Sequence, residues 1–319
     1  MKSPHTLVLA GILGLPLSGM LASGATLYSQ DFNTDSTASW TVNDPALSDV
    51  TADFFYDYSA IGVPAAPNGT GTRGLKMTAN NTGGVFSGFS VSPNGQSFTG
   101  DYVVRFDLWS NYAGPLGAGG SGTTQLSTYG LGSATSEVFW PGAATKASVA
   151  FAHTLDGGSA SDYRVYTSAF PTSAAAGNAV YAAPGGAINN SDAYYTAAFA
   201  GVSAPAGQLG AFPGQTGTTD AGEVAFRWLD IELTKIGNTV TWEIDGVLFA
   251  TVDTSALTLS GNNIFFGHSD TNAGSSSDPN DTLLNVTLVD NIRVTTIPEP
   301  AGAALALMGV AGLVRRRRR

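Results

Sequence analysis

Residues 223–252 constrain the fold most, because polar and apolar residues alternate through three consecutive segments. Segments 224–235, 239–244 and 247–252 each place their apolar side chains on one face, as expected for strands that are buried on one side. Gly237-Asn238 and Asp245-Gly246 separate the segments, and such dipeptides favour tight hairpin turns. The pattern therefore predicts a meander of three antiparallel strands.

Shorter strand patterns occur along the rest of the central region, separated by turn-forming residues. The chain holds 40 glycines and only 12% charged residues, a composition that favours many turns over long exposed helices. Residues 113–132 are rich in Gly, Ser and Thr and are predicted to form a loop. Residues 167–222 are predicted to form a long excursion with one short helix. The other predicted strands are 27–32, 50–58, 75–79, 85–91, 102–110, 149–153, 163–166, 263–267 and 283–295.

The meander resembles part of the laminin G and concanavalin A-like lectin/glucanase domains. It has a Trp-led strand at Trp228, a Gly turn at Gly237, a second strand with Trp242, and then Asp245-Gly246. Residues 31–32 and 289–294 are similar to the opening and closing strands of such domains. The resemblance implies an all-β, antiparallel jelly-roll β-sandwich over residues 26–296, a fold that often binds sugar or calcium.

The N-terminus has the pattern of a secretory signal peptide. Lys2 precedes an apolar stretch, residues 7–21, and small residues follow at 22–25. We expect residues 1–25 to be this signal, with cleavage after Gly24 or Ala25; the alternative is an uncut anchor. Cysteine is absent, which is compatible with export because a domain of this size can bury its own core.

The C-terminus, residues 297–319, combines two prolines, an uncharged run over 301–314 and five arginines. A helix that spans a bilayer needs about 20 apolar residues, so this run is short. Arginine clusters stay on the cytoplasmic side. The tail is predicted to form a short hydrophobic helix that holds the chain transiently in the inner membrane; a plain tail anchor is the alternative.

Pro298, Glu299 and Pro300, the apolar run and the terminal cluster resemble the PEP-CTERM sorting signal of Gram-negative bacteria. The cluster consists of Arg315, Arg316, Arg317, Arg318 and Arg319. The resemblance implies an exosortase-type transpeptidase as a partner. It also implies delivery to the envelope surface or the extracellular matrix.

The region between the two ends is acidic. Without Lys2, Glu299 and the five tail arginines, 8 basic and 23 acidic residues remain, so the net charge is near −15. This charge disfavours nucleic acid as a partner. It also supplies oxygen ligands of the kind that calcium prefers.

Two groups of acidic and amide side chains are candidates for a structural Ca²⁺ site. One group contains Asp31, Asn33 and Asp290, which come close if the terminal strands pair. The other group contains Asp270, Asp278 and Asp281 in one loop. The alternative is that these residues serve turns.

Catalytic patterns are incomplete. Glycoside hydrolysis needs two carboxylates across a sugar site, whereas Asp230–Glu232 and Glu243–Asp245 are separate pairs that also suit the solvated face of a hairpin. His153 and His268 are interpreted as structural or surface residues. The aromatic candidates for stacking on sugars are Tyr56, Tyr58, Trp109, Tyr129, Trp140, Tyr194 and Tyr195.

The sequence therefore predicts an exported, non-enzymatic protein of the cell surface or matrix with a structural, adhesive or weak glycan-binding role. Exopolysaccharide or other surface glycans are the expected ligands. The alternative is a glycan-binding or glycan-hydrolysing relative of the lectins and glucanases.

Overall fold

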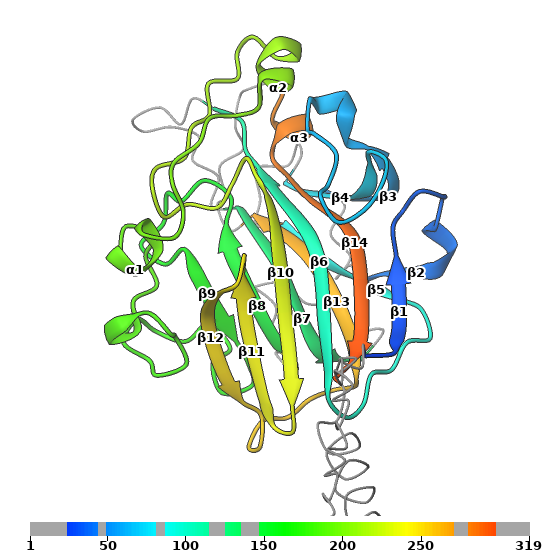
Figure 1. Cartoon of the computed structure of the whole chain (residues 1–319), viewed down its shortest axis with the longest axis vertical. Coiled ribbons are helices and arrows are strands. Elements are labelled where there is room, and N and C mark those ends of the chain that lie inside the picture. Colours follow the sequence, from blue (N-terminus) through cyan, green and yellow to red (C-terminus); the bar gives the residue numbers. More distant parts are fainter. Residues whose placement is uncertain are drawn as a thin grey trace, which may run out of the picture. The chain divides into compact units, whose positions relative to one another are not determined.

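Two antiparallel sheets pack face to face in a computed structural model of the chain (Figure 1). The structure describes residues 24–43, 49–80, 87–114, 125–134, 147–270 and 280–297. Residues from Ala25 to Ile297 form one compact unit. Residues 1–23 of the predicted signal peptide, the stacking candidate Trp140, the calcium candidate Asp278, and the tail from Pro298 to Arg319 lie outside the described residues.

Sheet A is the layer nearer the viewer in Figure 1 and has eight strands in the described part of the chain. The first and last strands of the chain lie side by side in it, because Thr26 pairs with Thr295. In order across the sheet its strands are β12 (Val247–Asp253), β11 (Thr239–Ile244), β10 (Trp228–Ile236), β6 (Tyr102–Asn111), β14 (Val286–Thr296), β4 (Arg73–Ala79) and β3 (Val50–Asp57), and β1 (Thr26–Gln30) pairs with β14.

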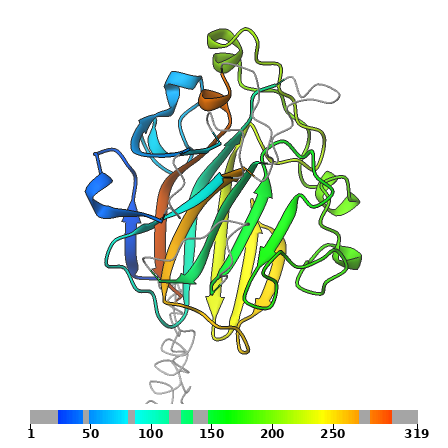
Figure 2. The ribbon, with the colours of Figure 1, turned by 180° about the vertical axis from the view of Figure 1, so that it is seen from behind.

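Sheet B is the layer nearer the viewer in Figure 2, and six of the described strands belong to it. Its order is β2 (Trp40–Asn43), β5 (Ser87–Pro93), β13 (Asn263–Asp270), β7 (Gln125–Ser133), β8 (Val149–Thr154) and β9 (Tyr163–Tyr166). Together the two sheets form the expected all-β jelly-roll sandwich.

Strand β7 corrects the prediction of a loop over residues 113–132. All nine residues of β7 are buried, and the strand lies between β13 and β8. Its small residues are needed there: a Cβ at Gly130 would lie 2.1 Å from the Val149 carbonyl oxygen and 2.6 Å from the Phe265 ring. Burial on both faces removes the alternation that marks a half-exposed strand.

The predicted meander is confirmed as β10, β11 and β12, with tight turns at Gly237 and Gly246. Strand β10 starts at Trp228, four residues later than predicted, because Phe226 has φ +58° and its N–H donates to the Ser110 carbonyl. Helices are short: α1 (Ala193–Thr196), α2 (Ala206–Ala211), α3 (Asp281–Leu284), and the 3-10 turns η1 (Thr37–Ser39), η2 (Tyr58–Ile61) and η3 (Pro184–Gly186).

Aromatic side chains fill the space between the sheets. Trp242 is fully buried, and its ring centroid lies 5.2 Å from that of Phe151 in sheet B and 5.0 Å from that of Phe249. Aromatic residues are favoured in such cores because each buries a large apolar area. The candidates Tyr58, Trp109, Tyr129 and Tyr195 are buried, so they are not exposed sugar platforms; Tyr56 and Tyr194 are half-buried.

A chain of polar side chains also crosses the core. Its members, in order, are Tyr129, His153, Ser110, Ser127, Thr287, His268 and Gln125, all nearly or fully buried. Ser110 and Thr287 come from sheet A and the others from sheet B, so the chain joins the two layers. Both histidines are therefore core residues, and burial lowers the pKa of each to about 3.

The excursion over 167–222 contains α1, α2 and η3, where one helix was predicted. It covers one edge of each sheet: Thr251 of β12 donates to the Val180 carbonyl, and Ala174 donates to the Val165 carbonyl of β9. The Tyr194 hydroxyl donates to the Leu248 carbonyl at 2.7 Å. Covered edges cannot pair with other chains, so we assign this segment a structural role.

Candidate functional site

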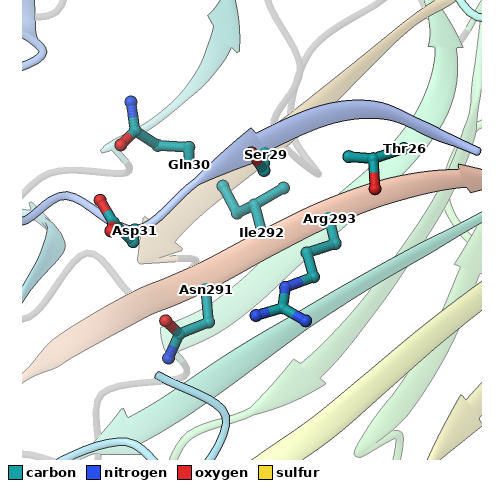
Figure 3. Close-up of a pocket in the computed structure, with 7 residues that line it drawn as sticks. All are labelled: Thr26, Ser29, Gln30, Asp31, Asn291, Ile292 and Arg293. Atoms are coloured by element: carbon teal, nitrogen blue, oxygen red, sulfur yellow. The ribbon is translucent and has the colours of Figure 1, made fainter. Parts of the chain in front are cut away.

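Three adjoining depressions on the outer face of sheet A share Asn291 and Arg293, and we call them together the β14 groove. Their volumes are about 390, 550 and 130 Å³. Figure 3 shows the first, between β1 and β14. The lining residues of the groove are Thr26, Ser29, Gln30, Asp31, Pro67, Asn68, Gly69, Thr70, Arg105, Phe106, Asp230, Asn291, Ile292 and Arg293.

A β-bulge in β14 shapes the groove. Asp290 pairs with Asp107 and Arg293 with Arg105, so three steps along β14 match two along β6. The extra residue is accommodated at Asn291, whose φ of +52° lies in the left-handed region that asparagine tolerates better than most residues. Bulges of this kind redirect side chains.

The floor of the groove is fixed by Asp107, which is fully buried. Its carboxylate accepts hydrogen bonds from the Asn68 amide side chain at 2.7 Å, the Asn68 backbone N–H at 3.2 Å and the Asn291 side chain at 2.7 Å. Gly69 lies so close to Asn291 that a Cβ there would be 1.8 Å from its side-chain oxygen. These contacts hold the loop over 66–70 against the sheet.

Asp290 and Tyr58 form a second buried contact below the loop. The Tyr58 hydroxyl donates to the Asp290 carboxylate at 3.1 Å and accepts from the Ala66 N–H at 3.2 Å. Burial, followed by the nearby charges of Asp107 and Asp31, raises the pKa of Asp290 to about 7. The groove is thus built over closely spaced carboxylates.

Like charges face one another across the strands here. Asp107 lies directly opposite Asp290 on one side and Asp230 on the other. Two residues from Asp107 on the same face of β6, Arg105 lies directly opposite Arg293 of β14. Like charges placed this way destabilise a sheet, and local conflicts of this kind concentrate at functional sites.

Arg105 is paired with Glu232 of β10, the only ion pair among the residues that the structure describes. The Arg105 side chain is 58% exposed and that of Glu232 is 22% exposed. Glu243 of β11 lies directly opposite Glu232, so the row of charged side chains extends from β6 over β10 to β11. Burial raises the pKa of both Asp230 and Glu243.

The sequence-predicted calcium candidates divide between two places. Asp31 lines the groove, and its charge contributes to the raised pKa of Asp290. The Asn33 side chain donates a hydrogen bond to the Asp31 carboxylate at 3.1 Å. Asp270 lies in sheet B, where it accepts from the Asn80 side chain at 2.7 Å. Asp281 begins α3, and its side chain lies outside the described part. Within the described ranges, no group of three or more His, Cys, Asp or Glu residues is arranged to hold a metal ion.

The outer face of sheet B differs from that of sheet A in the burial and polarity of its described residues. Its outward residues include Ser92, Leu126, Thr128, Ala152 and Phe265, all of which are buried. None of the outward positions in those strands is Asp or Glu. The carboxylate pairs considered in the sequence, Asp230–Glu232 and Glu243–Asp245, belong to β10 and to β11 with its following turn, in sheet A.

Sequence reasoning missed Asn68, Arg105, Asp107, Asn291 and Arg293 as site residues. The alternation over 102–110 does predict Arg105 and Asp107 on one face, as the structure has it. The pairing of Arg105 with Arg293 and of Asp107 with Asp290 is set by the strand register and by the bulge in β14. No local pattern signals those features.

A second acidic cluster lies where the excursion returns to the sandwich. Glu223 accepts from the Asn190 side chain at 3.3 Å and from the Asp220 N–H at 3.1 Å. Burial, followed by the charges of Asp220, Asp156 and Asp162, raises the pKa of Glu223 to about 8. Tyr112 and Tyr163 also face the cluster.

We expect Glu223→Gln to make the protein less sensitive to alkaline pH. Between the unfolded pKa near 4.5 and the folded pKa near 8, native Glu223 keeps a proton that the unfolded chain releases, so stability falls as pH rises. Glutamine stays neutral. Urea unfolding at pH 5 should show similar stabilities, whereas at pH 8 the variant should be more stable by about 2 kcal/mol, a value reduced for partial exposure. If the unfolding free energies of the wild type and the variant change with pH in parallel, Glu223 does not have the raised pKa assigned to it.

No helix among the residues that the structure describes is long and apolar enough to cross a membrane. No family model matches the chain, and no curated protein matches it.

Solved structures share its general architecture at low similarity. A Bacillus subtilis protein of unknown function with a galectin-like fold is 11% identical, with 86% of this chain and 97% of that one covered and a TM-score of 0.43. A carbohydrate-binding module from Bacillus subtilis is 8% identical, with 81% and 96% covered and a TM-score of 0.36. Bacillus licheniformis β-glucanase is 11% identical, with 87% and 100% covered and a TM-score of 0.36.

Proposed function

We propose that this chain is an exported, non-enzymatic, glycan-binding protein of the cell surface or extracellular matrix. The observation that carries the proposal is the β14 groove, a polar depression in which hydrogen-bond donors and acceptors are interspersed. Sugar hydroxyl groups donate and accept at once, so a ligand of this chemistry can use both kinds of group. An adhesive role follows if the glycan belongs to the matrix.

The groove is suited to binding because much of it is already ordered. Asp107 fixes the amide planes of Asn68 and Asn291, so these side chains lose little freedom when a ligand binds. Arg293 is exposed, and its guanidinium presents five N–H donors. Asp31 and Asp230 supply acceptors on either side.

Binding should be measured with the exported protein on an array of bacterial and plant glycans. We expect Arg293→Ala to weaken binding by about 10- to 100-fold, the range for a lost hydrogen bond to a charged group. Lys235→Ala is the matched control, because Lys235 lies at the β10–β11 hairpin and donates to the Gly100 and Gly237 carbonyls. Equal binding by both variants, or no glycan bound at all, would refute the proposal.

Export and sorting are part of the same proposal. The signal-peptide pattern of residues 1–25 and the tail over 297–319 support them, with an exosortase-type transpeptidase acting near Pro298, Glu299 and Pro300. Mass spectrometry of the cell-surface product should find both ends removed. An intact chain from Met1 to Arg319 in the cytosol would contradict it.

Hydrolysis of glycans is the second candidate function. Asp230 lines the groove with a raised pKa, and Glu232 lies two residues along the same face. Against it, Glu232 is paired with Arg105. The appearance of new reducing ends on a glycan panel, and their loss in Glu232→Gln, would favour hydrolysis over binding.

Calcium is proposed only beside Asp31, which lines one end of the groove, with Asn33 and Asp290 as the further ligands. Their donor chemistry fits, because two carboxylates and an amide oxygen are ligands that Ca²⁺ prefers. Asp290 is also buried beside Asp107 and Asp31, and a cation there would offset their repulsion.

We expect excess Ca²⁺ to raise the melting temperature over that in chelator by about 5 °C, since saturation near 100 times Kd stabilises by about 2.7 kcal/mol. Asp290→Asn should abolish the shift. An unchanged melting temperature would end the calcium proposal and leave the glycan proposal intact.

A further inference from the structure

We propose that the β14 groove binds an internal stretch of an uncharged, extended polysaccharide that lies across β1, β14, β6 and β10. This inference rests on the glycan-binding function proposed above. It adds the class of glycan and the way in which the glycan is held.

The shape of the groove points to a long ligand. Its three depressions succeed one another from Thr26 and Ser29 on β1, over Asn291 and Arg293, to Asp230 on β10. Neighbouring strands are about 4.8 Å apart, so a path across four strands is roughly 14 Å long. A single sugar ring would occupy only part of this path.

The ends of the groove point to an internal stretch instead of a chain end. At one end the groove reaches β1, which among the described strands pairs with β14 alone and has mostly exposed side chains. At the other end it continues onto the face of β10, where Glu232 and then Glu243 are partly exposed. In Figure 1 the lower halves of β10 and β11 lie uncovered at the front of sheet A. A polymer can therefore leave the groove in both directions.

The charges favour an uncharged polymer. Arg105 is balanced by Glu232, and Arg293 has Asp31 and Asp230 among the residues that line the same depressions. Buried Asp107 adds negative charge beneath them, and Asp290, whose pKa burial raises to about 7, adds part of a charge at neutral pH. An acidic polysaccharide would meet these carboxylates, and a basic one would meet two opposed arginines, whereas neutral hydroxyl groups can use both.

The test is calorimetric titration of the exported protein with oligosaccharide ladders. The neutral probes are mono- to hexasaccharides of β-glucan, α-glucan, mannan and xylan, and the acidic probes are oligogalacturonates and oligoalginates of equal length. We expect affinity for at least one neutral ladder to rise by tenfold or more from disaccharide to hexasaccharide and then level off. Acidic ladders should bind at least tenfold more weakly.

Variants at the two ends of the groove sharpen the test. Ser29→Ala on β1 and Asp230→Ala on β10 should each weaken hexasaccharide binding by about three- to tenfold, because one ligand contacts both. Lys235→Ala should not change it. Binding that is independent of length, tighter binding of an acidic ladder, or a response to only one end would overturn this inference while glycan binding stands. If no ladder of either kind binds, both proposals fail.

Discussion

Asp107→Ala should lower the free energy of unfolding by about 3 to 4 kcal/mol. The substitution removes an acceptor that is fully buried and receives three hydrogen bonds from Asn68 and Asn291. Hydrogen bonds to a charged group contribute about 1.5 to 3 kcal/mol each, and donors left without a partner in the interior are unfavourable. Relief of the repulsion from Asp290 offsets part of the loss. The melting temperature should fall by roughly 10 °C.

The same variant should lose glycan binding, because the loop over 66–70 is no longer held on the sheet. Asp230→Ala is the matched control for stability. Asp230 occupies the same line of carboxylates, but no described residue donates a hydrogen bond to its side chain. We expect its stability to change by less than about 1 kcal/mol. If both variants lose the same stability, the floor of the groove has been assigned wrongly.

His153→Ala should be comparably severe, with a loss of about 3 to 5 kcal/mol at pH 7. His153 is fully buried and is hydrogen-bonded to Ser110 at 2.8 Å and to Tyr129 at 3.3 Å, within the polar chain that joins the sheets. The variant loses the packing of the ring and leaves both hydroxyl groups without this partner. Tyr129→Phe, which removes only the weaker contact, should cost about 1 kcal/mol.

The pH dependence gives this prediction a second readout. The pKa of His153 is about 3 in the folded protein and about 6.5 when unfolded, so the unfolded chain gains a proton first as pH falls. The wild type therefore loses stability from this residue between about pH 6.5 and 3. The alanine variant lacks that loss, so the two unfolding free energies should converge as pH falls from 7 to 4. A constant difference would mean that His153 is not buried in its neutral form.

The sequence predicts the strands that show apolar alternation or a short apolar run, including the fully buried β8 and β13, and it misses a buried strand rich in small residues. Segment 239–244 matches β11 because Val240, Trp242 and Ile244 alternate with polar residues. Strand β7 was missed because Leu126 and Leu131 are separated by serine, threonine and glycine, and every residue is buried. Long-range packing between β13 and β8, not local pattern, makes this segment a strand.

For the candidate site, the sequence predicts only that Asp31, near the first strand, and Asp290, in the last strand, lie close together. Asp31 and Asp290 were expected to approach each other if the first and last strands pair, and β1 does pair with β14. The groove itself depends on the bulge at Asn291 and on the loop that brings Asn68 to Asp107. These contacts join residues far apart in sequence, so composition and spacing do not reveal them.

Glycan binding in the β14 groove is best tested by hydrogen–deuterium exchange of the exported protein, with and without a saturating neutral hexasaccharide. We expect slower exchange in residues 26–31, 66–70 and 290–293, which form the groove on sheet A, and unchanged exchange in β7 and β8 of sheet B. Protection confined to the strands of sheet B, with none around Asn291, would show that the glycan binds elsewhere.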